Sequence, residues 1–265
     1  MPATYLDHIL AFHRQRVAAD TRDWKNRGFV QRPRSSFREA LLEHRSSGLS
    51  VIAEVKRRSP SKGWLNENLN AGELATQYEK GGATAISVLT DETFFSGSVD
   101  DLNSVRCVSA LPILRKDFTL SANDVVDAVE MGASCVLLIV AALTPDELHS
   151  LINIAMGLHI DALVEVHTSE EASKALDAGA SIIGVNQRDL HSFAVDTARA
   201  QAVVASLNED VLAVAESGFA TPGAAEQAAI AGFDAILVGE AFVCSDEVQN
   251  LVRAFGGFPI GRRNS

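Results

Sequence analysis

The chain has 265 residues, of which 47% are hydrophobic and 22% are charged, so it is neither a disordered nor a collagen-like protein. Its formal charge of −11 argues against nucleic acid as the main partner, because nucleic-acid binding proteins usually present a basic face. No window approaches the roughly 18 uncharged apolar residues that a membrane span needs, so no membrane partner is expected.

The first 45 residues differ in charge from the rest of the chain. They hold nine Lys or Arg and five Asp or Glu, whereas residues 46–265 carry a net charge of −15. Apolar residues at helical spacing between Leu6 and Val17, and again between Phe37 and Leu42, predict two helices. We expect residues 1–48 to be a helical extension packed on the main domain, which is favoured over a basic docking surface.

Two features of the sequence bear on localisation. The N-terminus lacks the basic start and apolar stretch of a signal peptide, so none is expected. Cys107, Cys135 and Cys244 are an odd number without CxxC spacing, which favours buried, reduced thiols. Together these features predict a cytoplasmic protein.

From residue 49 onward, short apolar runs alternate with amphipathic stretches. Eight runs predict parallel strands buried on both faces, at residues 49–55, 84–90, 111–117, 134–140, 160–166, 181–186, 211–216 and 234–239. Residues 71–82, 121–132, 168–179 and 221–232 predict helices that each end in a glycine.

These glycines recur about every fifty residues, which is the length of two strand–helix units. Eight such units over residues 49–255 predict an α/β fold of the (β/α)8 TIM barrel type with an N-terminal helical extension. An open doubly wound sheet is the alternative, but it rarely has so many regular units. Residues 256–265 show little periodicity and are predicted to be a mobile tail.

Charged residues gather at the predicted carboxyl ends of the strands, where barrel enzymes place their working groups. Strand alternation puts Glu54 and Lys56 on one face, and it predicts that they meet Lys116, Glu165 and Glu216 in the barrel mouth. A purely structural ion-pair network is the alternative. Desolvating five charges costs several kcal/mol per ion unless they pair closely, so acid–base catalysis is favoured.

An anion site is predicted beside this cluster. Gly218 and Gly239 follow the last two strands, where glycines let backbone N–H groups approach a phosphate, and Ser59 would add a hydroxyl. The side chain of Glu240 is expected to turn away from this site. No metal is expected, because no HxH or HExxH motif is present and the lysines would repel a cation.

Six segments at the strand ends make a specific resemblance. They are IAEVKRRSPSKG (52–63), LPILRKDF (111–118), LVEVH (163–167), IGVNQRDL (183–190), AESG (215–218) and ILVGEAF (236–242). From about Leu6 to about Phe255, the chain resembles the indole-3-glycerol phosphate synthase family of tryptophan biosynthesis. The resemblance implies a carboxy-lyase that converts 1-(2-carboxyphenylamino)-1-deoxyribulose 5-phosphate to indole-3-glycerol phosphate. Carbon dioxide and water would be released by acid–base catalysis without a cofactor.

The resemblance also implies roles for individual residues. Lys116 would be the general acid of ring closure, Lys56 would hold the anthranilate carboxylate, and Glu165 would be a general base or cation stabiliser. Glu54 would orient the lysines and assist dehydration. The remaining implied residues are Asn186, Glu216 and Ser217 for catalysis, Arg188, Phe95, Phe118, Leu137 and Leu190 for substrate binding, and Ser59, Gly218 and Gly239 for the phosphate. Gln187 departs from the family, in which a second asparagine is expected.

The expected partners are this phosphorylated anthranilate–ribulose substrate and other enzymes of the tryptophan pathway. A Schiff-base aldolase or isomerase with Lys116 or Lys56 as nucleophile is one alternative, disfavoured because lysines flanked by carboxylates should stay protonated. A barrel that binds an anionic aromatic metabolite without turnover is another, but it would not need so many charges. We also expect residues 1–45 to act as a lid that excludes water from the mouth.

Overall fold

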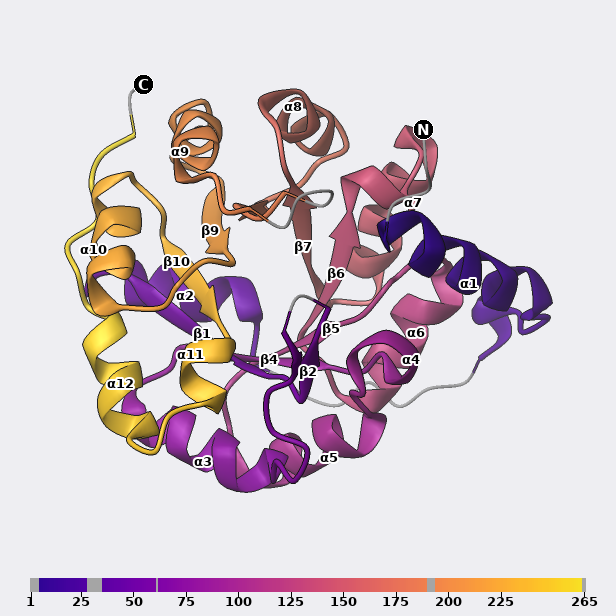
Figure 1. The fold of residues 1–265 in the computed structure, drawn as a ribbon. Coiled ribbons are helices and arrows are strands. Elements are labelled where there is room, and N and C mark those ends of the chain that lie inside the picture. The colour runs from indigo at the N-terminus through magenta and orange to yellow at the C-terminus, as the bar shows by residue number, and fades with distance from the viewer. Residues whose placement is uncertain (1–4, 28–34, 61, 190–193, 264–265) are drawn as a thin grey trace.

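The computed structural model describes residues 5–27, 35–60, 62–189 and 194–263, and in them eight parallel strands close into a barrel (Figure 1). The strands are β1 (Ser50–Val55), β4 (Ala85–Leu89), β5 (Ile113–Lys116), β6 (Cys135–Ile139), β7 (Asp161–Val166), β8 (Ile182–Asn186), β9 (Leu212–Glu216) and β10 (Ala235–Val238). They pair in chain order, and β10 returns to β1. The predicted TIM barrel and its eight strands are confirmed.

A helix follows each barrel strand and covers the outside of the barrel (Figure 1). These helices are α3 (Ala71–Gly81), α5 (Val99–Val108), α6 (Ala122–Met131), α7 (Pro145–Gly157), α8 (Ser169–Asp177), α9 (Thr197–Ala205), α10 (Pro222–Ile230) and α12 (Val248–Phe255). Shorter elements are η1 (Trp24–Asn26), β2 (Arg58–Ser59), β3 (Gly63–Trp64), α4 (Glu92–Phe95), η2 (Val140–Ala142) and α11 (Glu240–Val243). Among the described residues, no helix is long and apolar enough to span a membrane.

The glycines that end the predicted helices adopt the backbone conformation expected of them. Gly82, Gly132, Gly179 and Gly232 have φ angles between 87° and 95°. A residue with a side chain adopts such angles only with strain, whereas glycine adopts them without strain. All four predicted helices are confirmed, each ending within two residues of its glycine.

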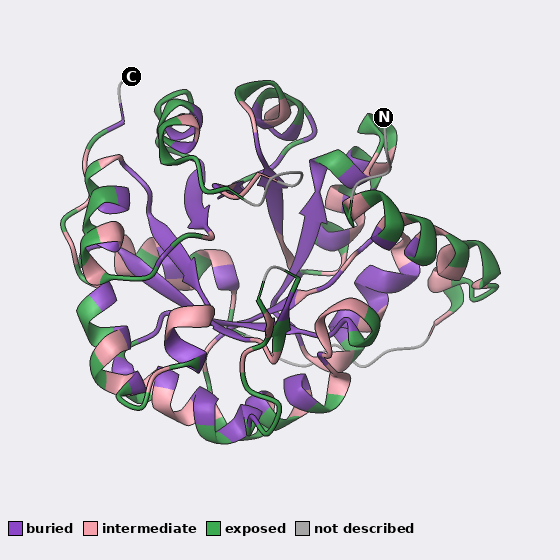
Figure 2. Ribbon diagram, in the orientation of Figure 1, coloured by how far each residue is buried: buried purple, intermediate pink, exposed green. Residues whose placement is uncertain are grey.

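The barrel strands are buried (Figure 2). Their alternate residues divide between two apolar cores. Outward residues such as Val164 and Val166 pack under the helices. Inward residues fill the barrel, and in β1, β5, β7 and β9 a charged side chain lies two positions beyond an inward apolar residue. These pairs are Ile52 and Glu54, Leu114 and Lys116, Leu163 and Glu165, and Val214 and Glu216. The two-residue period of a strand therefore aims all four charges into the mouth.

The two helices of the N-terminal extension lie at opposite ends of the barrel (Figure 1). Residues of α1 (Tyr5–Ala19) line the cavity at the carboxyl ends of the strands. In α2 (Phe37–Arg45), Phe37 and Leu41 are fully buried in the inner core. Before α2, Ser36 donates its hydroxyl to Asp161, the first residue of β7. Only α1 is therefore placed to act as the lid expected of residues 1–45.

The described part of the C-terminal tail is packed against the amino-terminal end of the barrel. The backbone N–H of Leu49 donates to the carbonyl of Phe258 at 2.8 Å. The side chain of Arg263 is 2% exposed, forms an ion pair with Asp234, and donates to the carbonyl of Val211 at 2.6 Å. One buried arginine thus attaches residues 256–263 to the barrel, while the mobility predicted for residues 256–265 stays a prediction and residues 264–265 lie outside the described residues.

The cysteines differ in burial. Cys135 is buried in β6, whereas Cys107 and Cys244 are exposed, and all three are free thiols. The prediction of buried thiols is therefore wrong for two of them. Burial raises the pKa of the Cys135 thiol well above its ordinary value, so that thiol stays protonated.

Candidate active site

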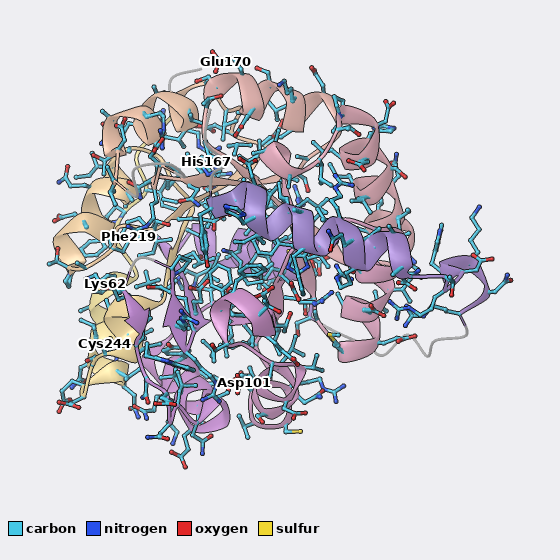
Figure 3. The ribbon with its side chains drawn as sticks, turned by 45° about the vertical axis from the view of Figure 1, so that its right-hand side comes forward. Lys62, Asp101, His167, Glu170, Phe219 and Cys244 are labelled. Atoms are coloured by element: carbon cyan, nitrogen blue, oxygen red, sulfur yellow. The ribbon has the colours of Figure 1, made fainter. Side chains whose placement is uncertain are left out.

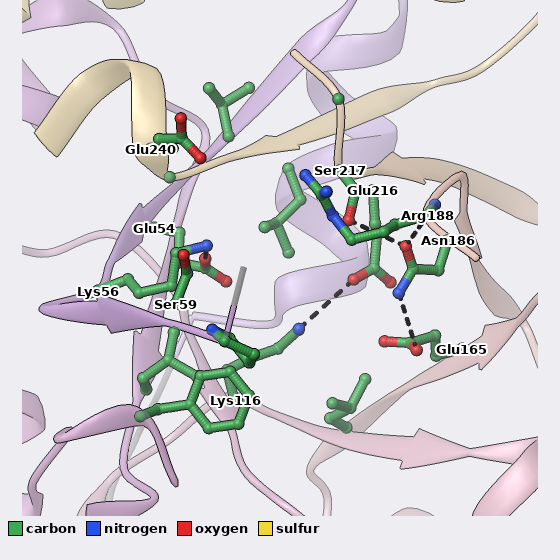
Figure 4. Close-up of a pocket in the computed structure, with 18 of the residues that line it drawn as sticks. Glu54, Lys56, Ser59, Lys116, Glu165, Asn186, Arg188, Glu216, Ser217 and Glu240 are labelled. Carbon is green, nitrogen blue, oxygen red and sulfur yellow. Dashed lines mark hydrogen bonds and ion pairs between the residues drawn. The ribbon is translucent and has the colours of Figure 1, made fainter. Parts of the chain in front are cut away.

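A cavity of about 500 Å³ opens at the carboxyl ends of the barrel strands (Figure 4). The predicted site residues line it, except Leu190, which lies outside the described residues. They are Glu54, Lys56, Ser59, Phe95, Lys116, Phe118, Leu137, Glu165, Asn186, Arg188, Glu216, Ser217, Gly218 and Gly239. The barrel thus gathers residues from across 186 positions of chain onto one cavity.

Glu54 and Lys56 form a close pair on one side of the mouth. Lys56 Nζ lies 2.8 Å from Glu54 Oε1, and the hydroxyl of Ser87 donates to Glu54 Oε2 at 3.3 Å. Burial alone would raise the pKa of Glu54, but the ammonium groups of Lys56 and Lys116 outweigh burial and lower that pKa. Glu54 therefore remains a carboxylate that orients Lys56.

Lys116 projects into the middle of the same cavity. Its Nζ lies 3.6 Å from Glu216 Oε2, and its side chain is 17% exposed. Burial lowers the pKa of Lys116, but Glu216, Glu54 and Glu165 outweigh burial, so that the pKa is raised above its ordinary value. Lys116 therefore stays charged, which suits a proton donor and disfavours the Schiff-base alternative.

Glu216 lies deepest among these acids. Its Oε1 is buried and has no hydrogen-bond partner among the described residues. Burial, and after it the charge of Glu165, raise the pKa of Glu216 to about 8, although Lys116 opposes the shift. Gly184 of β8 leaves room for this carboxyl group, since a Cβ there would overlap Glu216 Oε1. Near neutral pH Glu216 is thus largely a neutral acid that can donate a proton.

Asn186 connects Glu165 to the turn after β9. Its Nδ2 donates to Glu165 Oε1 at 3.1 Å, while its Oδ1 accepts from Ser217 Oγ at 2.9 Å and from the Arg188 N–H at 3.0 Å (Figure 4). Gln187, which departs from the family pattern, is buried and donates to the Ser217 carbonyl at 3.2 Å. Gln187 therefore supports the turn and is not among the residues that line the cavity.

The apolar wall of the cavity combines barrel loops with the N-terminal helix. Phe95 and Phe118 lie with ring centroids 6.4 Å apart, and Leu137 lies on the same wall. From α1, Tyr5 and Ile9 also line the cavity, together with Leu6. The sequence predicts the extension but not these contacts, because helical spacing shows which residues share a face and not what that face covers.

The predicted phosphate side of the cavity has an unusual backbone. Ser217 and Gly218 have φ angles of 69° and 84°, so two successive residues are left-handed. Gly239 lets the side chain of Glu54 approach the backbone of this loop closely, since a Cβ there would lie 2.7 Å from Glu54 Oε1. Glu240 lines the cavity and does not turn away as predicted, and its Oε1 lies 2.8 Å from Lys62 Nζ. Lys62 neutralises this carboxylate.

One group of potential metal ligands occurs among the described residues. Ligand atoms of His13, Asp91 and Asp117 all lie within 4.8 Å of one another. His13 Nε2 and Asp91 Oδ2 are hydrogen-bonded at 2.8 Å, and Asp117 Oδ2 accepts a hydrogen bond from the Arg115 guanidinium at 2.7 Å. These contacts attach α1 to the ends of β4 and β5, and the guanidinium beside Asp117 would repel a cation.

The fold and cavity define a TIM-barrel enzyme with acid–base groups at the barrel mouth. A sequence model described as indole-3-glycerol phosphate synthase matches residues 6–255. A protein of that name from Kineococcus radiotolerans is 44% identical over 257 residues, covering 94% of this chain and 93% of the relative. Another from Mycolicibacterium vanbaalenii is 48% identical over 214 residues, covering 81% and 79%. The chain belongs to the indole-3-glycerol phosphate synthase family.

More distant solved structures share the fold alone. N-acetylmannosamine-6-phosphate 2-epimerase from Clostridium perfringens superimposes with a TM-score of 0.60 at 17% identity, covering 81% of this chain and 93% of the other. The alpha subunit of tryptophan synthase from Legionella pneumophila gives a TM-score of 0.59 at 14% identity, covering 82% and 95%. Both likenesses agree with the closed barrel.

Proposed function

We propose that the residues around this cavity catalyse ring closure and decarboxylation of 1-(2-carboxyphenylamino)-1-deoxyribulose 5-phosphate. The products are indole-3-glycerol phosphate, carbon dioxide and water. The observation that carries this proposal is the convergence of Lys56, Lys116 and three glutamates on one cavity with an apolar wall. The chain's membership of the synthase family supports the same carboxy-lyase reaction. The substrate class is a small phosphorylated molecule.

Lys116 is proposed as the general acid of ring closure. Attack of the ring carbon on the substrate carbonyl moves an electron pair onto the carbonyl oxygen. The charged Lys116 ammonium, in the middle of the cavity, would donate a proton to that oxygen. The iminium formed in this step accepts the electron pair released when carbon dioxide leaves, so the carboxylate loss needs no cofactor.

Lys56 and Glu54 are proposed to work on the substrate as a pair. Lys56 would hold the anthranilate carboxylate, and Glu54, 2.8 Å from it, orients the ammonium group. Decarboxylation restores the aromatic benzene ring, and forming the indole then requires loss of a proton and of the hydroxyl as water. Glu165 would accept the proton, while Lys56 or the neutral acid Glu216 would protonate the departing hydroxyl.

The remaining residues are proposed to bind the two ends of the substrate. Phe95, Phe118 and Leu137 would hold the aromatic ring on the apolar wall. Ser59, with Gly218 and Gly239, would bind the phosphate through its hydroxyl and their backbone N–H groups. Arg188 and Asn186 with Ser217 would contact the ribulose hydroxyls between these ends, and Leu190 belongs to the ring pocket by resemblance alone.

Product formation tests the proposed function directly. Mixing the enzyme with the carboxyphenylamino-deoxyribulose phosphate should produce indole fluorescence, and Lys116→Ala should abolish it while the barrel stays folded. Treatment with borohydride in the presence of substrate should leave the protein unmodified. A trapped covalent adduct would support the Schiff-base alternative, and binding without turnover would support a non-catalytic barrel.

We also propose that the enzyme works in the cytoplasm. All three cysteines are free thiols, and two are exposed, which fits a reducing compartment. Cell fractionation with an antibody to the chain would test this placement. Recovery of the protein outside the cytoplasmic fraction would contradict it.

A further inference from the structure

His167 follows β7 directly, and the proposed mechanism gives it no role. The residue is 7% exposed and is not among the residues that line the cavity. Its ring lies next to Glu165, which does line the cavity, and beside the start of α8, as its place in Figure 3 shows. A buried histidine at this position therefore contacts the proposed base from the side away from substrate.

Both ring nitrogens of His167 face carboxylates. Nδ1 lies 3.3 Å from Glu171 Oε2 on α8, and Nε2 lies 3.6 Å from Glu165 Oε1 on β7. Nε2 is buried and has no hydrogen-bond partner among the described residues. The three side chains thus form a row, Glu171–His167–Glu165, that leads from the first turn of α8 to the cavity.

The charges around the ring favour its protonated form. Acidic side chains face it from three elements: Glu171 on α8, Glu165 on β7 and Glu216 on β9. Burial lowers the pKa of His167, but the hydrogen bond to Glu171 and the charge of Glu165 outweigh burial, so the pKa is raised above its ordinary value. The protonated ring therefore places a positive charge 3.6 Å from Glu165 Oε1.

The two carboxylate oxygens of Glu165 differ in their contacts with the protein. Oε1 accepts from Asn186 Nδ2 at 3.1 Å and faces His167 Nε2. Oε2 accepts no hydrogen bond from any residue that the structure describes, while Glu165 lines the cavity. One oxygen is therefore fixed by the protein, and the other is free to take a proton from substrate.

We propose that His167, held by Glu171, is a positioning residue that places a positive charge beside Glu165 and fixes its Oε1, leaving Oε2 as the basic atom of the synthase reaction. The proposal rests on the proposed function of Glu165. His167 acts through Glu165 and does not touch substrate. In this arrangement two neighbouring acidic residues have different roles: Glu165 is the base and Glu216 is the neutral acid.

The structural alternative is that Glu171 only caps α8. Its Oε2 also accepts the backbone N–H of His167 at 2.6 Å, and its own N–H donates to Thr168 Oγ1 at 3.2 Å. Glu171→Gln keeps an oxygen that can accept the backbone N–H but removes the charge beside the ring. Glu170→Gln is a matched control, because Glu170 is an exposed neighbour in the same turn of α8 (Figure 3).

The experiment compares pH profiles of kcat and kcat/KM, followed by indole fluorescence, for the wild type, His167→Gln, Glu171→Gln and Glu170→Gln. His167→Gln keeps a donor toward Glu165 but loses the positive charge. We expect the acid limb to move to higher pH by about one unit in His167→Gln, and by less in Glu171→Gln. KM and the melting temperature should change little, and Glu170→Gln should match the wild type.

Each result has a defined meaning. An active wild type whose acid limb stays in place in the folded variants would overturn the proposal and leave the proposed function intact. Equal shifts in Glu170→Gln and Glu171→Gln would also overturn it, because any charge on α8 would then suffice. If His167→Gln does not fold, Glu171→Gln alone decides. A wild type that makes no indole product would overturn the proposed function and this proposal with it.

Discussion

Two buried clusters of charge lie at opposite ends of the same barrel. At the carboxyl end, Lys56 and Lys116 face three glutamates around a cavity of about 500 Å³. At the amino-terminal end, Asp234 is fully buried between Arg263 and Arg45, with Arg45 Nε 2.8 Å from Asp234 Oδ1. The mouth has two bases and three acids, whereas the amino-terminal cluster has two bases and one acid, and the ion pairing of the two clusters also differs.

The buried ions of the amino-terminal cluster form close pairs, whereas in the mouth Glu54 and Lys56 form a close pair and Lys116 and Glu216 do not. Besides its ion pair, Arg263 donates to the carbonyls of Gly232, Asn208 and Val211 at 2.6–3.0 Å. In the mouth, Lys116 lies 3.6 Å from Glu216, whose Oε1 has no partner among the described residues. Asp234 Oδ1, like Glu216 Oε1, accepts no hydrogen bond from the described residues, but it lies 2.8 Å from Arg45 Nε. Closely ion-paired charges stabilise a fold, and charges left partly unpaired beside a cavity are available to a substrate.

Substitution of Lys116 should give the largest effect and should separate catalysis from folding. Lys116→Met removes the proposed acid, so kcat/KM should fall roughly 1,000-fold, within the range of general acid catalysis. The melting temperature should change little, because the mouth charges stabilise the fold weakly. Indole fluorescence and thermal unfolding measure the two effects. The matched control is Lys80→Met on the outer face of α3, and a Lys116→Met enzyme with at least a tenth of wild-type activity would contradict the assignment.

The corresponding substitution at the amino-terminal end should do the reverse. Arg263→Met leaves Asp234 buried without its closest counter-charge, which should cost about 3–5 kcal/mol of the free energy of unfolding. The melting temperature should fall by roughly 10 °C, while the folded enzyme keeps its kcat. Arg262→Met, at the exposed neighbouring residue, is the control. An unchanged melting temperature for Arg263→Met would show that the tail is not anchored as described.

Gly184 tests how tightly the mouth is fitted around Glu216. A methyl group at this position would overlap Glu216 Oε1 and would come 3.3 Å from Leu163 Cδ1. We expect Gly184→Ala to lower kcat by about 10- to 100-fold through displacement of Glu216, with a smaller change in KM. Gly157→Ala is the control, because a Cβ there meets nothing within 4 Å. Equal kcat values for the two variants would mean that the position of Glu216 is unimportant.

The sequence predicts the barrel, and the position of the candidate site residues at its mouth, for a physical reason. Strand and helix periods are local, and the two-residue period of a strand carries Ile52 to Glu54 and Leu163 to Glu165 on one face. The fold then brings the strand ends together whatever their separation along the chain. This is why residues from Glu54 to Gly239 could be predicted to share one mouth.

What could not be predicted depends on contacts between distant side chains. Helical spacing predicts α1 and α2 but gives no sign that one lies at the mouth and the other, through Phe37, at the opposite end. The anchoring of Arg263 and the need for glycine at position 184 are invisible for the same reason. Each depends on a partner, Asp234 or Glu216, that lies more than 25 positions away in the chain.

The last prediction concerns acid-to-amide substitutions, which should have opposite signs at the two ends. Because the pKa of Glu216 is raised to about 8 from 4.5, the folded state holds a proton that the unfolded chain releases. Its contribution to stability is therefore present at low pH and is lost as pH rises from 4.5 toward 8. Glu216→Gln removes this loss, so at pH 8 the variant should gain about 1–2 kcal/mol, or roughly 2–8 °C in melting temperature, while turnover falls. Burial raises the pKa of Asp234 too, but Asp234→Asn should destabilise the protein at pH 8, because it leaves Arg263 and Arg45 without their counter-charge. Melting temperatures of both variants between pH 5 and pH 8 give the sign of each change in stability relative to the wild type. Destabilisation by Glu216→Gln at every pH would show that the charges in the mouth are paired as closely as those at the opposite end.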